Sequence, residues 1–158
     1  MLKEMLGVRE GIFADLHRDH EEVSSLLTQI LDTTDNHKRG ELFGEMMSKL
    51  LAHAKAEQKI LYRKIEKSRD SDARKFAFEG EVEHEVVQSQ LQQLARARNK
   101  DTEQWTARMV FLQEAVEHHV KEEERTGFSC AHQEFDSEEL KKLREQFQRE
   151  KNKMLEAT

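Results

Sequence analysis

The stretch that decides the fold is LLAHAKAEQKILY, residues 50–62. It carries His53 and Glu57 in the pattern His-x-x-x-Glu, and residues four apart on a helix lie on one face, one turn above the other. Leu50 and Ile60 belong to the apolar stripe of the same segment, so both polar side chains are predicted to point inward. Burying a carboxylate without a partner is costly, so this stretch implies a positively charged partner in the core.

The same pattern recurs near the other end of the chain, in EHHVKEEE, which contains His119 and Glu123. Two further histidines continue apolar stripes without a carboxylate, His20 in LHRDHEEV and His84 in EVEHEVV. The order is a lone His followed by His-x-x-x-Glu, repeated once, with spacings of 33 and 35 residues between the histidines of each pair. We therefore predict two helix pairs related by pseudo-two-fold symmetry, each supplying three ligands to one core.

Six buried imidazoles and carboxylates in one core favour a metal site, and this ligand chemistry suits iron, manganese or zinc. Two halves of three ligands predict two metal ions bridged by the two glutamates. Two octahedral ions offer roughly twelve positions, and the ligands with a bridging oxide or hydroxide fill all but about two. The predicted metal ligands are His20, His53, Glu57, His84, His119 and Glu123.

The helical register at the second motif has an alternative. His118 and Glu122 have the same spacing as His119 and Glu123, but they are rotated by about 100° around the helix. The apolar stripe favours His119, so His118 is predicted to face solvent. Tyr62, close to the first motif, is a candidate for hydrogen bonding to a ligand. His17 is expected to flank the site, with a supporting contact to a ligand as the alternative.

Composition and periodicity predict one all-α domain over residues 1–158. Charged residues make up 37% of the chain and proline is absent, which is typical of helical proteins. We predict an antiparallel up-down-up-down four-helix bundle over about residues 10–128, followed by a short extra C-terminal helix over about 136–153 that packs on the outside or frays. The expected bundle helices cover about residues 11–31, 41–66, 72–98 and 102–127, with Asp101 capping the fourth and Gly127 closing it.

The remaining composition excludes several classes of protein. The net charge of −6 without a basic stripe argues against nucleic acid as a partner. No apolar run approaches the roughly 20 residues of a membrane span, and the N-terminus does not resemble a signal peptide. Cys130 is the single cysteine, so no intramolecular disulfide is possible. We expect a cytoplasmic protein that is a monomer or a weak dimer.

The quoted motifs resemble the hemerythrin-like HHE cation-binding family over roughly residues 10–130. The resemblance implies a hemerythrin-like bundle with two non-haem Fe ions, with zinc or manganese as substitutes. It also implies that the four histidines are terminal ligands and that Glu57 and Glu123 bridge. Oxygen-carrying hemerythrins have a further histidine where this chain has Gln88. The four-His, two-Glu set looks more like the bacterial iron–sulfur-cluster repair proteins.

The function that these residues favour is binding or sensing of O2, nitric oxide or hydrogen peroxide at a diiron centre. One alternative is an enzyme that reduces nitric oxide or peroxide, or that takes part in iron–sulfur-cluster repair. Another is iron storage or buffering. The sequence alone leaves these alternatives open, because it shows no substrate pocket beyond the metal site.

Overall fold

The computed structural model describes residues 10–157, and every regular element in this range is a helix. The elements are α2 (Ile12–Asp32), α3 (Asn36–Glu57), η1 (Gln58–Tyr62), α4 (Arg63–Ile65), α5 (Ser71–Arg96), α6 (Glu103–Glu122), η2 (Glu123–Gly127), α7 (Phe128–Glu134) and α8 (Ser137–Glu156). This confirms the all-α prediction. Within the described range, none of the helices combines the length and the apolar character needed to cross a membrane.

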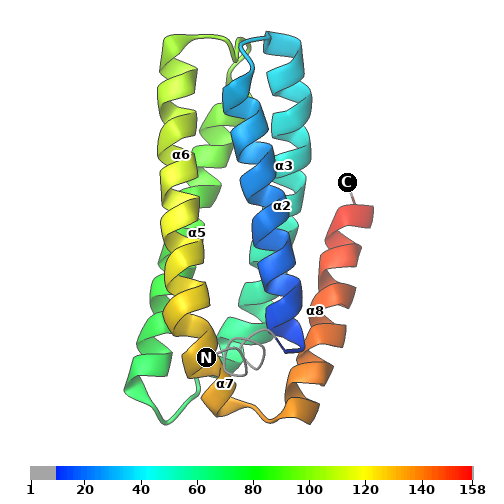
Figure 1. Cartoon of the computed structure of the whole chain (residues 1–158), viewed down its shortest axis with the longest axis vertical. Helices are drawn as coiled ribbons and strands as arrows, with labels where there is room; N and C mark the ends of the chain where they lie inside the picture. The colour runs from blue at the N-terminus through cyan, green and yellow to red at the C-terminus, as the bar shows by residue number, and fades with distance from the viewer. Residues whose placement is uncertain (1–9, 158) are drawn as a thin grey trace.

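Four long helical stretches lie side by side along the long axis of the molecule (Figure 1). They are α2, the continuous stretch α3–η1–α4, α5, and the continuous stretch α6–η2–α7. α2 packs against α3 and α6, while α5 packs against α6 and α3, so each helix has two neighbours in the bundle. α8 lies outside these four, against α2 and α3 (Figure 1).

Three predicted helix ends differ in the structure, two of them because another residue caps the helix. The second helix begins at Asn36 and not near residue 41, because the Asp35 side chain accepts a hydrogen bond from the Lys38 amide and caps it. Thr102 caps α6 in place of Asp101, by accepting from the Trp105 amide at 3.1 Å. Residue 127 does not end the fourth helix, which continues through η2 into α7.

A π-helix follows each His-x-x-x-Glu motif directly. η1 begins at Gln58, one residue after Glu57, and η2 begins at Glu123 itself. Single π-turns inside α-helices are rare and are frequent at functional sites. The extra residue of each π-turn changes the rotation of the following helix relative to its apolar stripe. The repetition at both motifs supports the pseudo-two-fold relation between the two helix pairs.

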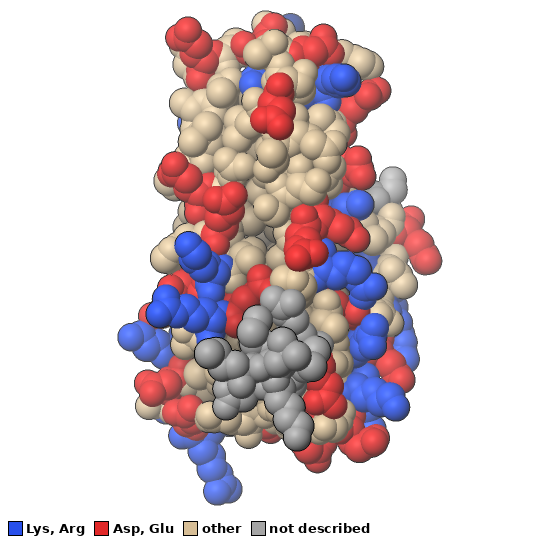
Figure 2. Space-filling model, viewed as in Figure 1, with Lys and Arg blue, Asp and Glu red and all other residues tan. Residues whose placement is uncertain are grey.

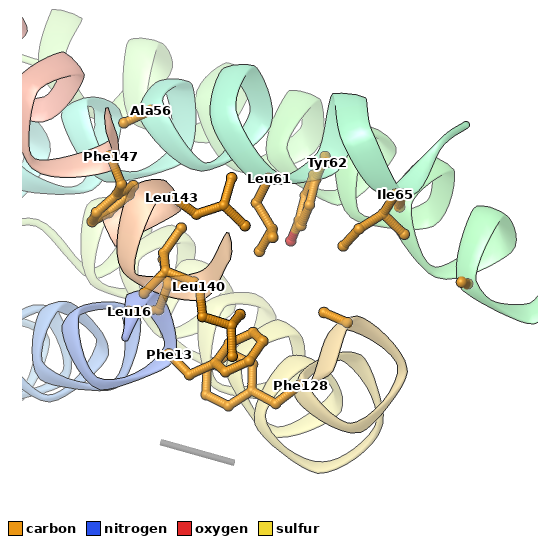
Figure 3. Packing of buried hydrophobic residues seen from close by; sticks show 14 residues of the cluster. Phe13, Leu16, Ala56, Leu61, Tyr62, Ile65, Phe128, Leu140, Leu143 and Phe147 are labelled. Carbon is orange, nitrogen blue, oxygen red and sulfur yellow. The ribbon is translucent and has the colours of Figure 1, made fainter. Parts of the chain in front are cut away.

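The buried apolar residues form two clusters on either side of a polar layer. The first core cluster joins the start of α2, the segment around η1 and α4, and α7 to α8. Leu140, Leu143 and Phe147 of α8 are fully buried in this cluster (Figure 3). The second core cluster fills the opposite half of the bundle and includes Leu27 and Trp105. α8 has 20 residues and a complete capping box at its start, and it packs on the outside of the four helices as one of the two expected alternatives.

Candidate metal centre

All six predicted ligands lie in the polar layer between the two core clusters. Their ligand atoms form two groups, and within each group the atoms lie within 4.8 Å of one another. The first group contains His20, His53, Glu57 and Glu123, and the second contains Glu57, His84 and His119. Glu57 belongs to both groups, so its carboxylate lies between the two halves.

The four imidazoles turn the same nitrogen toward the two central carboxylates. His20 Nε2 lies 3.2 Å from Glu123 Oε1, and His84 Nε2 lies 3.2 Å from Glu57 Oε1. His119 Nε2 is 3.4 Å from Glu123 Oε2, and His53 Nε2 is 3.8 Å from Glu57 Oε2. Each carboxylate thus contacts histidines of both helix pairs.

The Nδ1 atoms of the histidines point away from the two central carboxylates. For the two motif histidines, His53 and His119, Nδ1 faces the carboxylate of the residue that precedes a lone histidine in the sequence. His53 Nδ1 is 2.9 Å from Oδ2 of Asp19, the residue before His20. His119 Nδ1 is 3.3 Å from Oε1 of Glu83, the residue before His84. A carboxylate on the far nitrogen fixes the ring orientation and the tautomer of a metal-bound histidine.

The other two outward nitrogens face the residue that follows each central glutamate. His84 Nδ1 donates to Gln58 Oε1 at 3.3 Å, and His20 Nδ1 lies 3.4 Å from Glu124 Oε2. Sequence reasoning missed all four of these supporting residues. The sequence repeats a polar residue beside each motif histidine or glutamate in both halves, but this repetition does not indicate which of these residues contact the histidines.

The side-chain atoms of the site fit a bound metal cation, because several of them are buried without a hydrogen-bond partner. Buried atoms without a hydrogen-bond partner include Nε2 of His20 and His53, both carboxylate oxygens of Glu57, and Oε1 of Glu123. Buried polar atoms are nearly always paired in folded proteins, so such a cluster needs an explanation. Inward-facing nitrogen and oxygen lone pairs are what a bound cation would satisfy.

In the metal-free molecule, protons take the place of that positive charge. Burial alone would lower the pKa of His20, but its contacts with Glu123 and Glu124 outweigh burial and raise the pKa to about 9. Contacts with Glu123 and Glu83 likewise overcome burial at His119 and raise its pKa to about 10. These two protonated rings hold the pKa of Glu123 well below its usual value despite its burial.

The other three predicted ligands, His84, His53 and Glu57, stay neutral. Burial, with the charge of His119 nearby, lowers the pKa of His84 to about 3. Burial also lowers the pKa of His53, although its contact with Asp19 acts in the opposite direction. The pKa of Glu57 is raised well above its usual value, first by burial and then by the neighbouring Glu123.

Tyr62 is fully buried and reaches the site from η1. Its hydroxyl donates to Glu123 Oε2 and lies 3.4 Å from His119 Nε2, and its ring stacks on His84 at 5.3 Å between centroids. Tyr62 therefore hydrogen-bonds to Glu123, one of the predicted ligands. The ring has room because residue 80 is glycine: a Cβ there would lie 2.6 Å from the Tyr62 ring.

An enclosed cavity of about 30 Å³ adjoins the four histidines. The rest of its wall is aliphatic, from Val23, Leu50, Ala54, Val87, Val116 and Val120. A space of this size holds one water or a diatomic molecule. Neither central glutamate nor Tyr62 lines it, so the cavity meets the site on the side of the histidine rings.

Three residues that sequence reasoning discussed lie as follows. His118 is exposed, as predicted. Gln88 is exposed as well, so it does not line the site, contrary to the expectation that it takes the place of a fifth histidine. His17 Nδ1 contacts Glu124, which in turn contacts His20, so the supporting role that was the alternative for His17 describes it better.

Comparisons with known proteins agree with the geometry. The sequence matches the family described as the hemerythrin HHE cation binding domain over residues 11–131. It is also 28% identical over 143 residues to a protein of Nostoc sp. (strain PCC 7120 / SAG 25.82 / UTEX 2576) described as a DNA nickase. That alignment covers 88% of this chain and 38% of the relative, so the chain spans well under half of the relative's length. No solved structure matches the sequence significantly.

Proposed function

The chain belongs to the hemerythrin HHE cation-binding domain family, and from this premise we propose that it is a non-haem diiron protein that binds or senses a small diatomic molecule or peroxide. The observation that carries the proposal is the convergence of four histidine Nε2 atoms on two buried carboxylates. Buried imidazole with carboxylate is a ligand set that suits iron.

We assign one ion to each helix pair. His20 and His53 would hold the first ion, and His84 and His119 the second. Glu57 would bridge because its oxygens belong to both groups of ligand atoms. Glu123 would form a second bridge because its two oxygens contact His20 and His119 respectively. This arrangement agrees with an antiparallel up-down-up-down order of the four long helices, which their short connections favour.

The residues around the centre support a small, weakly polar ligand. A bound iron pair supplies open coordination positions and can exchange electrons with a small molecule. The aliphatic wall of the cavity excludes bulk water and limits the ligand to a few atoms. On the other side of the site, Tyr62 orients Glu123 through its hydroxyl hydrogen bond.

DNA cleavage, which the name of the Nostoc relative describes for that protein, is not part of the proposal for this chain. A cavity of about 30 Å³ cannot admit a nucleotide. The net charge is −6, and Figure 2 shows acidic and basic side chains interspersed over the face that it presents. Phosphate binding instead relies on clustered lysine and arginine.

Elemental analysis and rapid-mixing spectroscopy test the proposal. Protein produced with iron available should contain close to two irons per chain and absorb in the near ultraviolet, whereas the zinc-loaded protein should not absorb there. The reduced iron protein should form an adduct with O2 or nitric oxide. A stable adduct supports binding or sensing, and turnover with an electron donor supports the enzymatic alternative. A single zinc per chain with no iron-dependent absorption would overturn the diiron assignment.

A further inference from the structure

A groove of about 740 Å³ runs along α5, facing α6, η2 and α7. Its floor includes the aromatic ring of Phe76, and its α5 side carries Phe78 and Val82, whose exposed fractions are 51% and 58%. Large apolar side chains that are grouped and exposed mark interaction surfaces. Among the described residues that line the groove, the acidic ones are Asp72, Glu79, Glu83 and Glu122, against one lysine, Lys75.

The corresponding face of the other helix pair is already occupied by α8. Leu140, Leu143 and Phe147 form the apolar edge of α8 and are buried against α2, α3 and η1. Phe147 contacts the His53 ring edge-on, with 5.8 Å between the ring centroids. We call the helix pair with His53 the covered half of the site, and the pair α5 and α6, with His119, the open half.

Basic and amide side chains of α8 bind two carboxylates of α2. Asp15 Oδ2 accepts from Arg144 at 3.2 Å and from Gln148 at 2.6 Å. Asp19 Oδ1 accepts from Lys151 at 2.8 Å. Apolar residues in the centre and ion pairs at one side thus hold α8 on the covered half.

The open half presents an equivalent pair of carboxylates, and no helix of residues 10–157 covers them. His20 and His84 are 64 residues apart, and the same shift converts Asp15 into position 79 and Asp19 into position 83. Both positions are glutamate, and both line the groove. The Glu83 side chain is 34% exposed, whereas that of Asp19 is 9% exposed.

The opposite wall shows which kind of helix the groove fits. Ala56 lies three residues after His53 and is fully buried next to α8. The corresponding residue three after His119 is Glu122, and it is exposed in the groove. The groove is therefore flanked by carboxylates on both walls. A second copy of this surface would bring like charges together, which is unfavourable at an interface.

We propose that the groove between α5 and α6 binds a basic amphipathic helix of a partner protein. Its apolar edge packs on Phe78 and Val82, as helices that dock in grooves do with residues spaced three and four apart. Its lysine or arginine side chains bind Glu79 and Glu83 on one wall and Glu122 on the other. The proposal concerns a surface and does not depend on which metal the site holds.

A labelled synthetic peptide with the sequence of residues 136–156, which already binds the pseudo-equivalent face, is the probe. It is titrated with the full chain, metal-free and iron-loaded, and fluorescence anisotropy reports binding. Val82→Glu in the protein should weaken binding at least tenfold. Val110→Glu should leave it unchanged, because Val110 is also exposed, at 38%, but does not line the groove. A peptide in which Arg144 and Lys151 are alanine should bind more weakly.

Three results would overturn the proposal. One is no measurable binding of the peptide to the unmodified protein. Another is equal binding to the Val82→Glu protein, which would place the peptide elsewhere, for instance on the covered half in exchange for α8. The third is a dimer in sedimentation that Val82→Glu converts to a monomer, which would make a second copy the occupant. Iron binding that persists while peptide binding fails would separate this proposal from the diiron assignment.

Discussion

The covered and open halves of the site repeat the same residue pattern in different surroundings. Each half has one His-x-x-x-Glu motif, one lone histidine and one carboxylate behind a histidine Nδ1. The covered half lies beneath α8, while in the open half the corresponding carboxylate, Glu83, borders a solvent-filled groove. The bundle helices themselves therefore place the six predicted ligands. α8 changes the exposure of the outer carboxylate, Asp19 against Glu83, and not the placement of the predicted ligands.

The largest expected effect tests how much α8 stabilises the covered half. Phe147 is fully buried between α8 and the bundle, so Phe147→Ala should lower the free energy of unfolding by about 3–5 kcal/mol. The matched control, Phe78→Ala in the open half, should change it by no more than about 0.5 kcal/mol, because Phe78 is 51% exposed. Denaturant unfolding of both variants gives the comparison. Equal losses would show that the exposed groove is already covered in solution.

The second prediction compares a ligand of the open half with its exposed neighbour. Loss of a residue that merely supports a ligand typically costs about 10- to 100-fold in metal affinity, so His119→Ala should cost at least that. His118→Ala should leave the affinity unchanged, because its side chain is exposed and turned away from the centre. Competition with a coloured chelator measures both. A loss of affinity in His118→Ala without a loss in His119→Ala would place His118, and not His119, at the metal.

The positions of the predicted ligands could be inferred because the apolar stripes fix which face of each helix is buried. His20, His53, His84 and His119 continue those stripes, and the burial of His20, His53 and His119 and the partial burial of His84 follow from the period of 3.6 residues. The inward orientation of Glu57 and Glu123 could be predicted from their position four residues after a histidine on the same helix. Periodicity could not indicate the π-turns, because each adds only one residue and shifts the stripe after the motif has ended.

The supporting residues and the role of α8 could not be predicted for a different reason. Asp19, Glu83 and Gln58 lie at the flanks of the stripes, where a polar residue is ordinarily read as exposed. Their contacts depend on how neighbouring helices are rotated toward one another, which one sequence does not reveal. The apolar edge of α8 does not by itself indicate which face it packs on, and the contacts of α8 with Asp15 and Asp19 of α2 join residues more than 125 positions apart in the sequence.

The third prediction asks whether the two halves titrate alike without metal. Each half pairs one histidine of raised pKa, about 9 for His20 and about 10 for His119, with one of lowered pKa, His53 or His84. A histidine with a raised pKa stabilises the folded protein at pH values below about 6.5, the pKa of histidine in the unfolded chain. For His20 and His119 this stabilisation is lost as the pH rises through about 9 to 10. Lowered values act in the other direction, because the folded protein resists protonation as pH falls below 6.5.

The metal-free protein should therefore be most stable near neutral pH and lose stability on both sides, at alkaline pH as His20 and His119 lose their protons and at acid pH as His53 and His84 gain them. Imidazole NMR should find His20 and His119 protonated at pH 8 and His84 neutral at pH 5, with His53 staying neutral to a lower pH than a free histidine. A difference between the halves, with only His119 and His84 shifted, would mean that the cover of α8 and not the shared carboxylates sets the charge state. With metal bound, acidification should instead release the ions, because their ligands must lose protons to bind.

The smallest expected effect compares the two outer carboxylates directly. Asp19→Asn removes the charge behind His53 in a buried setting, so metal affinity should fall by about tenfold, the lower end of the usual range for such supporting groups. Glu83→Gln removes the charge behind His119, but its side chain is 34% exposed and the solvent screens it, so the loss should stay below tenfold. Both replacements keep the shape of the side chain and a carbonyl oxygen that can accept from Nδ1.

If the proposed partner helix covers Glu83, then bound peptide should raise the loss of metal affinity in Glu83→Gln toward the loss in Asp19→Asn, measured by the same chelator competition. A Glu83→Gln loss as large as that of Asp19→Asn without peptide would show that exposure does not distinguish the halves and that bundle geometry alone sets the strength of these contacts.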